Sequence, residues 1–397
     1  MSAKQEAFSA ESFVVAPVRD LPKSGIREFF DLVAGRTDVI SLGVGEPDFT
    51  TPWNIRESAI YSLEAGHTAY TSNAGTPALR KAICQYLHSD YQLDYDPMSE
   101  CLVTIGVSEA LDLAMRALIN PGDEVIYTSP SFVSYPAEVL MARGVPVPLP
   151  TKDVDNFSVN PDDLRKLITP RSKVLLLNFP CNPTGAVANE DVLREIASIA
   201  CEHNLIVISD EIYSELVYDG WKHVSIASLP GMKERTIFLH GFSKAFAMTG
   251  FRIGYVCAPK AITDAMYKIH QYSIMCASIT AQEAALEALK TARKDMIAMR
   301  DSYWERRNII VRGLRDAGLD CVMPQGAFYA FPSIKSTGMT SREFAEKLLK
   351  EESVAVVPGS AFGPGGEGYV RACYATAEDQ IIEALKRIKR FVAKYSK

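Results

Sequence analysis

Three stretches of sequence decide the fold: KVLLLNFPCNPTG at 173–185, LIVISDEIY at 205–213 and TIFLHGFSKAFAMTGFRIG at 236–254. Each opens with an uninterrupted apolar run of strand length and then changes to polar residues, glycine or proline. Continuous apolar runs are typical of strands that are buried on both faces of a parallel sheet. We therefore predict strands at 173–178, 205–210 and 236–240, with polar residues emerging where each strand ends.

The surrounding sequence extends this pattern into an α/β domain. Short apolar runs recur at 124–128 and 145–149, and helical periodicity appears between the runs, at 135–143, 161–168 and 189–203. Strands that alternate with helices predict a mostly parallel sheet covered by helices. The polar strand ends would then meet at the edge where open α/β sheets bind ligands.

The C-terminal third has a different organisation. Helical periodicity dominates residues 261–317, and we predict one long helix within it, at 281–314, that bridges two domains. Beyond it, helices at 341–350 and 378–395 and strands at 354–357 and 369–375 form a smaller α+β unit, whose sheet residues 40–42 could complete. A chain of 397 residues exceeds the usual size of one hydrophobic core. We expect a large domain at 48–290, and a small domain at 291–397 to which the N-terminal segment 1–47 contributes.

Composition and charge narrow the classes of function. The formal net charge is −6, and lysine and arginine are dispersed without basic runs, so we expect neither nucleic acid nor a membrane as a partner. Eight cysteines are scattered without a CxxC pair, and no spacing of cysteine and histidine resembles a metal site. The N-terminus lacks a signal-peptide pattern, and no stretch of eighteen apolar residues occurs. These features predict a cytoplasmic protein without a metal.

One glycine-rich motif is a poor candidate for a ligand site. Gly363-Pro-Gly365-Gly-Glu-Gly368 matches the GxGxxG pattern of dinucleotide-binding folds. That motif binds a pyrophosphate when it follows a strand and opens a helix, whereas this copy precedes the strand-like residues 369–375. We interpret it as a mobile loop, which leaves a nicotinamide-dependent dehydrogenase with little support.

The polar residues at the strand ends carry the candidate chemistry. Lys244 lies beyond the strand at 236–240, where partial burial favours loss of its proton, and a neutral lysine forms Schiff bases with aldehydes. Ser243 and Arg252 beside it suit a phosphate group, because they offer a hydroxyl donor and a fork-shaped cation. The alternative is a surface loop with a solvated lysine.

The other two strand ends add complementary groups. Two prolines and a glycine rigidify the turn that holds Asn182, whose amide could donate to a phenolate-like oxygen. Asp210 ends its strand, where a carboxylate needs a partner such as a cationic ring nitrogen, and Tyr213 is a second oxygen donor. A plain Asn-Pro turn and a helix-capping aspartate are the alternatives. The three strand ends together favour a ligand site.

These segments resemble the class I aminotransferases, the aspartate-aminotransferase-like group of fold type I pyridoxal-phosphate (PLP) enzymes. The resemblance runs from 40–48 (ISLGVGEPD) to 371–375 (RACYA) and is closest to the bacterial subgroup with the motifs GEPDF, NPTG and SKxFAMTGxRIGY. It implies an α/β fold with PLP as cofactor. It also implies a homodimer that moves the amino group of an L-amino acid to a 2-oxo acid, such as 2-oxoglutarate, in a ping-pong reaction.

The resemblance assigns roles around the cofactor ring. Lys244 would carry PLP as a Schiff base and shuttle the substrate proton, and Asp210 would pair with the pyridinium nitrogen. Asn182 and Tyr213 would bind the ring oxygen, and Phe132 would stack on the ring.

The phosphate of the cofactor would lie where a helix begins after the strand at 101–105. Backbone N–H groups of Val107, Ser108 and Glu109 would bind it, together with Ser243 and Arg252. The carboxylate of Glu109 is an unfavourable neighbour for a phosphate, so we expect it to turn away.

A further set of residues would bind the substrate and complete the dimer. Arg371 would hold the α-carboxylate, with Asn182 nearby and Gly45 leaving room for it. Arg116 could bind a distal acid of the substrate, or be a solvated helix residue. Tyr70 would reach the phosphate from the other subunit. The amino donor stays open, as do two other functions: a PLP-dependent carbon–sulfur lyase and a non-catalytic binding protein that kept the fold.

Overall fold

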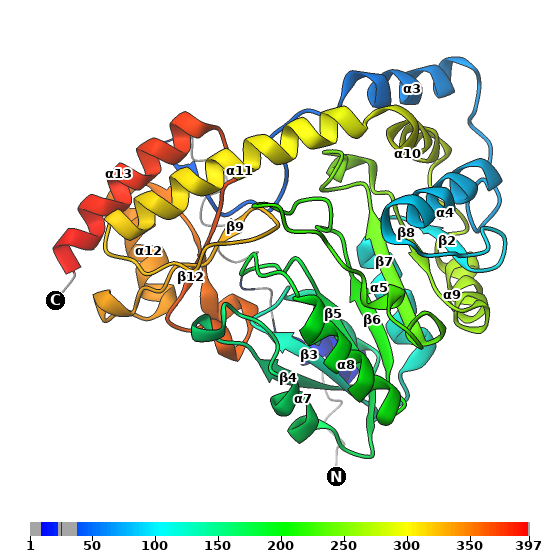
Figure 1. The fold of residues 1–397 in the computed structure, drawn as a ribbon, viewed down its shortest axis with the longest axis horizontal. Helices are drawn as coiled ribbons and strands as arrows, with labels where there is room; N and C mark the ends of the chain where they lie inside the picture. Colours follow the sequence, from blue (N-terminus) through cyan, green and yellow to red (C-terminus); the bar gives the residue numbers. More distant parts are fainter. Residues whose placement is uncertain (1–8, 23–24, 26–37, 396–397) are drawn as a thin grey trace, which may run out of the picture.

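The largest layer of the structure, a computed structural model that describes residues 9–22, 25 and 38–395, is a seven-stranded sheet in the order β2-β8-β7-β6-β5-β3-β4 (Figure 1). Its strands span Cys101–Thr104 (β2), Glu124–Ser129 (β3), Val145–Pro150 (β4), Ser172–Asn178 (β5), Ile206–Asp210 (β6), Thr236–Gly241 (β7) and Gly254–Cys257 (β8). β8 runs antiparallel to both of its neighbours, and the remaining pairs are parallel. The predicted mostly parallel sheet is confirmed.

Helices cover both faces of this sheet because successive strand residues point to opposite sides. Leu176 and Ile208 pack against one set of helices, which includes α5 and α9, whereas Leu175 and Val207 pack against α7 and α8 on the other face. The helices of this unit span Trp53–Glu64 (α3), Pro77–Tyr91 (α4), Val107–Leu118 (α5), Ser134–Met141 (α6), Pro161–Leu167 (α7), Glu190–Glu202 (α8), Lys260–Ser273 (α9) and Ile279–Thr291 (α10). A short helix, α1, spans Ala16–Arg19. None of the helices in the described part of the chain is long and apolar enough to cross a membrane.

A second unit has its own core and two small sheets. Strands Val357–Pro358 (β11), Val370–Cys373 (β12) and Tyr329–Ala330 (β9) form an antiparallel sheet, and Ile40–Ser41 (β1) pairs in parallel with Val354–Ala355 (β10). Helices Arg293–Asp316 (α11), Ser341–Glu352 (α12) and Glu378–Tyr395 (α13) pack on them. Residues 40–41 therefore do join a sheet of this unit, whereas the domain boundaries proposed from sequence stay a prediction.

Two predictions about elements were wrong. The helix predicted at 281–314 is two helices, because Ala292 leaves the helical conformation at φ −92° and ψ 14° and ends α10 before α11 begins. α10 and the first turn of α11, with Met296, pack into a core cluster of the large unit, and α11 from Met299 onward packs into the core of the small unit. The strand predicted at 354–357 is likewise divided between β10 and β11, which belong to different sheets.

The glycine-rich segment 363–368 has no dinucleotide-binding context. It lies between β11 and β12 and contains a short 3-10 turn at Pro364–Gly366. A side chain at Gly365 would lie 2.9 Å from the carbonyl oxygen of Ser129, so the segment packs closely against the end of β3. It packs as a turn against that strand end, and a strand rather than a helix follows it directly.

Candidate active site

A cavity of about 430 Å³ opens where the large unit meets the small one. Polar strand ends of the large sheet line one side of it, and residues of β9, β12 and the segment after β1 line the other. The sequence-predicted residues that line it are Gly45, Val107, Ser108, Phe132, Asn182, Asp210, Tyr213, Ser243, Lys244, Arg252 and Arg371. The structure thus brings together residues that are up to 326 positions apart in the chain.

Lys244 projects into this cavity from the loop that follows β7. Its Nζ donates a hydrogen bond to the carbonyl oxygen of Gly45 at 2.7 Å. Burial lowers the pKa of Lys244 to about 8, and the positive charges of Arg371 and Arg252 act in the same direction. A lysine with this pKa is partly neutral near physiological pH, which is the state that acts as a nucleophile or base.

Asp210 ends β6 as a buried carboxylate. Tyr135 donates a hydrogen bond to its Oδ2 at 2.8 Å, and the backbone N–H of Ile212 donates to Oδ1 at 3.2 Å. Burial raises the pKa of Asp210 to about 6 in spite of these hydrogen bonds. A cation placed against it would favour the ionised form and offset its desolvation.

Asn178 connects the end of β5 to both neighbouring site residues. Its side-chain amide donates to the backbone carbonyl of Asp210 at 2.9 Å, and its Oδ1 accepts from the backbone N–H of Asn182 at 3.0 Å. One side chain thereby fixes the loop of Asn182 against the end of β6. The bonds that precede Pro180 and Pro183 are cis.

The small unit contributes a buried arginine. Arg371 on β12 donates to Oδ1 of Asn182 at 2.8 Å and to the carbonyl of Gly43 at 2.7 Å, and its guanidinium lies 4.4 Å from the ring centre of Tyr329. Its Nε has no hydrogen-bond partner, and the hydrogen bonds that it makes go to neutral groups of the described chain. A buried guanidinium in these surroundings is suited to an anion.

Gly45 lies against this arginine, and a side chain there would force Tyr329 to shift. A Cβ at this position would lie 2.7 Å from the hydroxyl oxygen of Tyr329 and 3.5 Å from Nη2 of Arg371. The hydroxyl groups of Tyr329 and Tyr213 share a hydrogen bond of 2.7 Å. Burial raises the pKa of Tyr213 well above its usual value. Both phenols therefore stay protonated and can donate a hydrogen bond.

An anion cradle lies at the beginning of α5. Gly106 precedes the helix with φ +92°, and a Cβ there would lie 2.9 Å from Nη2 of Arg252, so the guanidinium lies over the helix start. Gly254 lets the backbone of β8 lie close to the start of α5, since a Cβ at that position would meet the backbone nitrogen of Val107 at 2.9 Å. Free backbone N–H groups at a helix start and a nearby guanidinium together favour a phosphate.

The carboxylate of Glu109 turns away from this cradle, as expected from the sequence. Its Oε2 accepts from the backbone N–H of Ile105 at 2.6 Å, and its Oε1 lies 2.6 Å from Nδ1 of the buried His270. The negative charge is therefore held behind the helix start, which removes the objection to an anion at this position.

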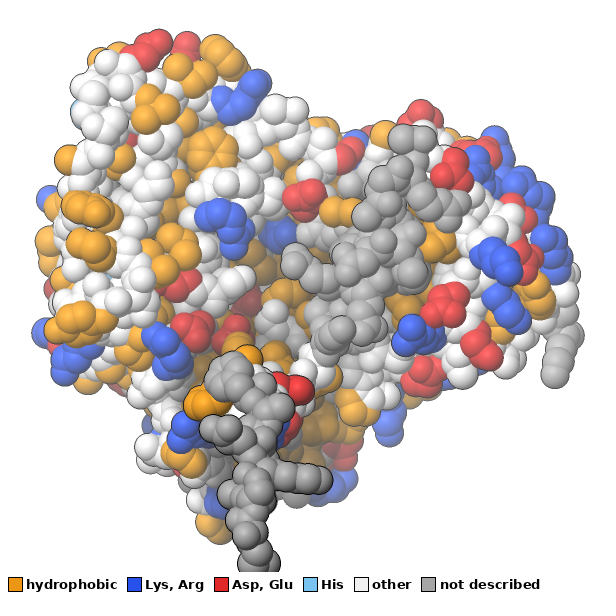
Figure 2. Space-filling view, turned by 180° about the vertical axis from the view of Figure 1, so that it is seen from behind, with side chains coloured by type: hydrophobic (Ala, Val, Ile, Leu, Met, Phe, Trp, Pro, Cys, Tyr) orange, Lys and Arg blue, Asp and Glu red, His pale blue; other side chains and the backbone are white. Residues whose placement is uncertain are grey.

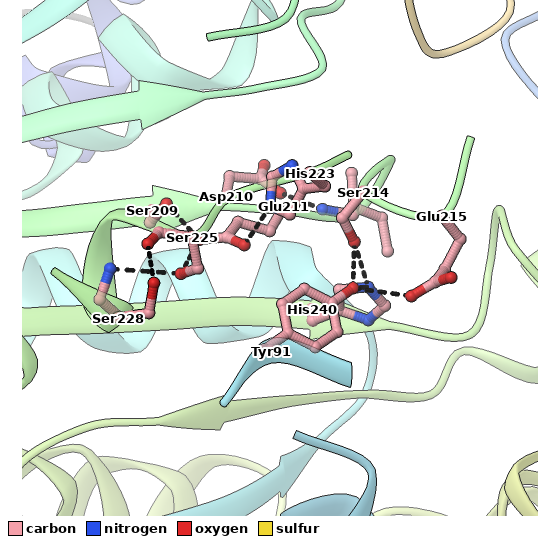
Figure 3. Close-up of polar contacts among 12 residues, drawn as sticks. Tyr91, Ser209, Asp210, Glu211, Ser214, Glu215, His223, Ser225, Ser228 and His240 are labelled. Carbon is pink, nitrogen blue, oxygen red and sulfur yellow. Dashed lines mark hydrogen bonds and ion pairs between the residues drawn. The ribbon is translucent and has the colours of Figure 1, made fainter. Parts of the chain in front are cut away.

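A polar network supports the end of β6 from the other face of the sheet (Figure 3). Glu211 is buried there, and its carboxylate accepts hydrogen bonds from Ser209 at 2.8 Å and Ser225 at 2.6 Å. Nε2 of His223 lies 2.6 Å from its other oxygen. Glu211 directly follows Asp210, the last residue of β6, and the two carboxylates lie on opposite sides of the sheet, so holding Glu211 behind the sheet helps to hold Asp210 in the cavity.

His240 holds the end of β7 in place through hydrogen bonds of its ring. The backbone N–H of Gly241 donates to its Nδ1 at 2.8 Å, and its Nε2 lies 2.9 Å from the hydroxyl oxygen of Ser214 (Figure 3). Burial lowers the pKa of His240 to about 3, so the ring is neutral and its Nε2 carries the proton. This contact anchors the segment that leads to Lys244.

Besides Glu109, two predicted residues lie outside the cavity. Arg116, in the last turn of α5, pairs with Asp112 at 3.3 Å and donates to Ser273 at 3.1 Å. Tyr70 is 81 % exposed on the surface of this chain. Neither lines the cavity formed by the described residues.

Comparison with known proteins agrees with this geometry. Residues 37–388 match the family model described as aminotransferase class I and II. The chain belongs to this aminotransferase family. It is 54 % identical to "Putative aminotransferase YugH" of Bacillus subtilis (strain 168), an alignment that covers 96 % of this chain and 99 % of the relative.

Two further relatives differ in the substrate that they are named for. The aminotransferase is 48 % identical to an aspartate aminotransferase of Pyrococcus abyssi, over 92 % of this chain and 95 % of the relative. It superimposes with a TM-score of 0.89 and 47 % identity on the crystal structure of an aromatic aminotransferase from Pyrococcus horikoshii OT3, over 93 % and 99 % of the two chains. The family is therefore clear, and the amino donor is not given by it.

This aminotransferase is a PLP-dependent transaminase, and its cavity fits that cofactor. PLP presents a phosphate, a ring nitrogen that can be protonated, a ring oxygen and an aldehyde. The cavity offers an anion cradle at α5, the buried carboxylate of Asp210, the donors Asn182 and Tyr213, and the amine of Lys244. Each group of the cofactor has a chemically suitable partner.

Sequence reasoning missed several residues that position this site. Tyr135, Asn178 and Tyr329 make the contacts described above, yet each lies in an apolar or structural context in the sequence. Tyr135 belongs to a predicted helix, and Asn178 was interpreted as the last residue of a strand. Asn178 alone carried a usable signal, since it too is a polar residue at a strand end.

We predict that Asp210 makes the stability of the cofactor-free aminotransferase depend on pH. Its pKa rises from 3.8 to about 6 on folding, so the folded state binds the proton more tightly and loses relative stability as the pH rises through 6. Compared with Asp210→Asn, which does not titrate, the wild type should lose about 1–2 kcal/mol between pH 5 and pH 8, from a total of about 3 kcal/mol. Urea unfolding of both proteins measures this. Lys244 titrates in both, so its contribution cancels, and a difference that is independent of pH would contradict the prediction.

Proposed function

We propose that the aminotransferase catalyses a reversible, ping-pong transfer of the amino group of an L-amino acid to a 2-oxo acid such as 2-oxoglutarate, with Lys244 as the residue that binds PLP and moves the proton. The observation that carries this proposal is one cavity in which an amine with a lowered pKa lies between a buried carboxylate and a buried guanidinium. A cofactor-binding lysine, a partner for a ring nitrogen and a partner for a substrate carboxylate are the groups that transamination needs.

Bound PLP would supply a ring that accepts electrons from the substrate. Asp210 would keep the ring nitrogen protonated, because an ion pair with a cation offsets the cost of burying its charge. Asn182 and Tyr213 would donate hydrogen bonds to the ring oxygen, and Phe132, whose ring packs edge-on against Tyr135 at 5.7 Å, would stack on the ring.

The phosphate would be held by the cradle at the start of α5. The backbone N–H groups of Val107, Ser108 and Glu109 are free for it, and the side chains of Ser243 and Arg252 line the same cavity. The Glu109 carboxylate takes no part, because Ile105 and His270 hold it elsewhere.

The α-carboxylate of the substrate would bind to Arg371. Its position over Tyr329 and beside Asn182 fixes the plane of the guanidinium, so a carboxylate that meets it leaves the α-carbon oriented toward Lys244. The amine of Lys244, with a pKa of about 8, would then take a proton from the Cα of the substrate and return it. We propose that Arg116 is a structural residue of α5 and does not bind a distal acid.

We propose that the active unit is a homodimer in which Tyr70 completes the partner's phosphate site. The side chain of Tyr70 is 81 % exposed on the surface of this chain. Further large hydrophobic residues are exposed on α3, among them Trp53 and Tyr61. Figure 2 shows hydrophobic side chains along the side of the molecule that carries α3, α9 and α10. Exposed apolar groups of this extent support an interface with a second copy.

We propose that the enzyme is cytoplasmic. All eight cysteines are unpaired, and six of them are buried, which suits a reducing compartment where thiols persist.

We predict that borohydride reduction of the yellow holoenzyme fixes PLP on Lys244, as peptide mapping will show. Lys244→Ala should lower the rate of transamination by at least about a thousandfold, because it removes both the attachment and the proton-transferring amine. Lys260→Ala, on an exposed lysine, is the control and should keep full activity. Attachment of the label to another lysine would refute the assignment.

We predict that two inactive variants restore activity when their subunits exchange. Tyr70→Ala should weaken the phosphate site and Lys244→Ala should abolish catalysis, each in every site of its own homodimer. A mixed dimer would have one site with both defects and one with neither, so full exchange of an equal mixture should recover about a quarter of wild-type activity. A fully active monomer at any dilution would disprove the composite site.

We predict that the two arginines differ in how they affect amino donors. Arg371→Ala should lower kcat/KM by about ten- to a hundredfold or more for every donor, because each presents the same α-carboxylate. Arg116→Ala should leave aspartate, alanine and aromatic donors within about twofold of wild type. A selective loss with aspartate or glutamate would show instead that Arg116 reaches a substrate, in this subunit or its partner.

A further inference from the structure

Three cysteines that are far apart in the sequence meet in the core of the large unit. Cys101 and Cys257 lie opposite each other on the antiparallel strands β2 and β8, and Cys84 lies on the buried side of α4, which covers them. Their three sulfur atoms all lie within 4.8 Å of one another. None of the three cysteines lines the cavity of the active site.

We propose that these three thiols form a binding site for a soft, thiolate-preferring divalent cation with trigonal coordination. Three thiolates at about 2.3 Å from one ion are about 4 Å apart, and the three sulfur atoms already lie within 4.8 Å of one another. Two rigid strands and a helix fix the ligands, so the site is largely formed before the ion binds.

Buried polar atoms without a hydrogen-bond partner lie beside the three cysteines, and they are the second observation that supports the proposal. Arg80 lies one helical turn before Cys84 on the same face of α4, it is 5 % exposed, and its Nε has no hydrogen-bond partner. Tyr255 lies two residues before Cys257 on the same face of β8, and its buried hydroxyl is also without a partner.

Tyr95 adds a third unpartnered group beside the thiols. Its hydroxyl is buried without a hydrogen bond, and Tyr95 packs in the same core cluster as Tyr255 and the three cysteines. Three of the eight buried side-chain atoms without a partner in the described chain thus gather at this place. Such donors have no role beside neutral thiols, whereas thiolate sulfurs would accept from them.

The charges of the proposed site balance. Binding breaks three S–H bonds, releases three protons to solvent and forms three metal–sulfur bonds, and no electron is transferred. A divalent ion with three thiolates carries one negative charge, which the guanidinium of Arg80 offsets inside the core. A monovalent ion would leave an excess of negative charge, and a zinc ion would lack the fourth protein ligand that it takes in structural sites.

Cadmium is the probe that tests this proposal. The holoenzyme would carry Cys201→Ser and Cys276→Ser, which remove the two cysteines that are not buried. Under anaerobic conditions, Cd²⁺ should bind with one equivalent per chain, with a thiolate-to-cadmium absorption band in the ultraviolet and release of about three protons. A titration without that band at one equivalent would overturn the proposal.

Variants of single buried cysteines separate this site from other thiols. Cys84→Ser in the same background should weaken cadmium binding by about a hundredfold or more and reduce the absorption band, since one ligand is lost. Cys321→Ser, a buried cysteine of the small unit, is the matched control and should bind as the parent does. Retention of the PLP absorption band and of the melting temperature would show that each variant is folded, with Cys84→Ala as the replacement if Cys84→Ser is not. An unchanged isotherm in a folded Cys84 variant would disprove the site.

Discussion

Parallel pairing of β5, β6 and β7 is the constraint on which the site depends. The register places Asn178 beside Asp210 and Asp210 beside Leu239, so the segments that follow these strands leave the sheet at one edge. Alternation along β6 sends Asp210 into the cavity and keeps Ser209 behind the sheet, where the carboxylate of Glu211, the residue after the strand, also lies. A shift of one residue would exchange these faces and would put the wrong carboxylate in the cavity.

The cavity contains more positive than buried negative charge, so it is suited to anionic ligands. Lys244, Arg252 and Arg371 place three basic side chains around one buried carboxylate. Phosphate and substrate carboxylate groups would neutralise the two guanidinium groups, and a protonated ring nitrogen would neutralise Asp210. The buried pair of Glu109 and His270 shows how the chain keeps an unwanted negative charge out of that balance.

Much of this could be predicted from the sequence, because the chemistry lies at the ends of strands that are recognisable as apolar runs. Lys244, Asp210 and Asn182 follow directly from that pattern and from the family motifs. What escaped prediction depends on contacts between distant residues: Tyr135 reaches Asp210 across 75 positions, and His270 reaches Glu109 across 161. The break at Ala292 escaped for a related reason, since a helical pattern in the sequence does not reveal that its two halves pack into different cores.

The glycine at position 45 separates two tasks of the cavity, which are to bind the group that all amino-acid substrates share and to select among their side chains. Tyr329 and Arg371 lie so close to this glycine that any side chain there would force Tyr329 to move. Val44 and Ile212, which also line the cavity, come from two separate segments and are not bound by that constraint. Replacements there could alter the preference for a substrate while the apparatus for transamination stays intact. The architecture is thus evolvable, because residues of separate segments can change one at a time around a fixed glycine.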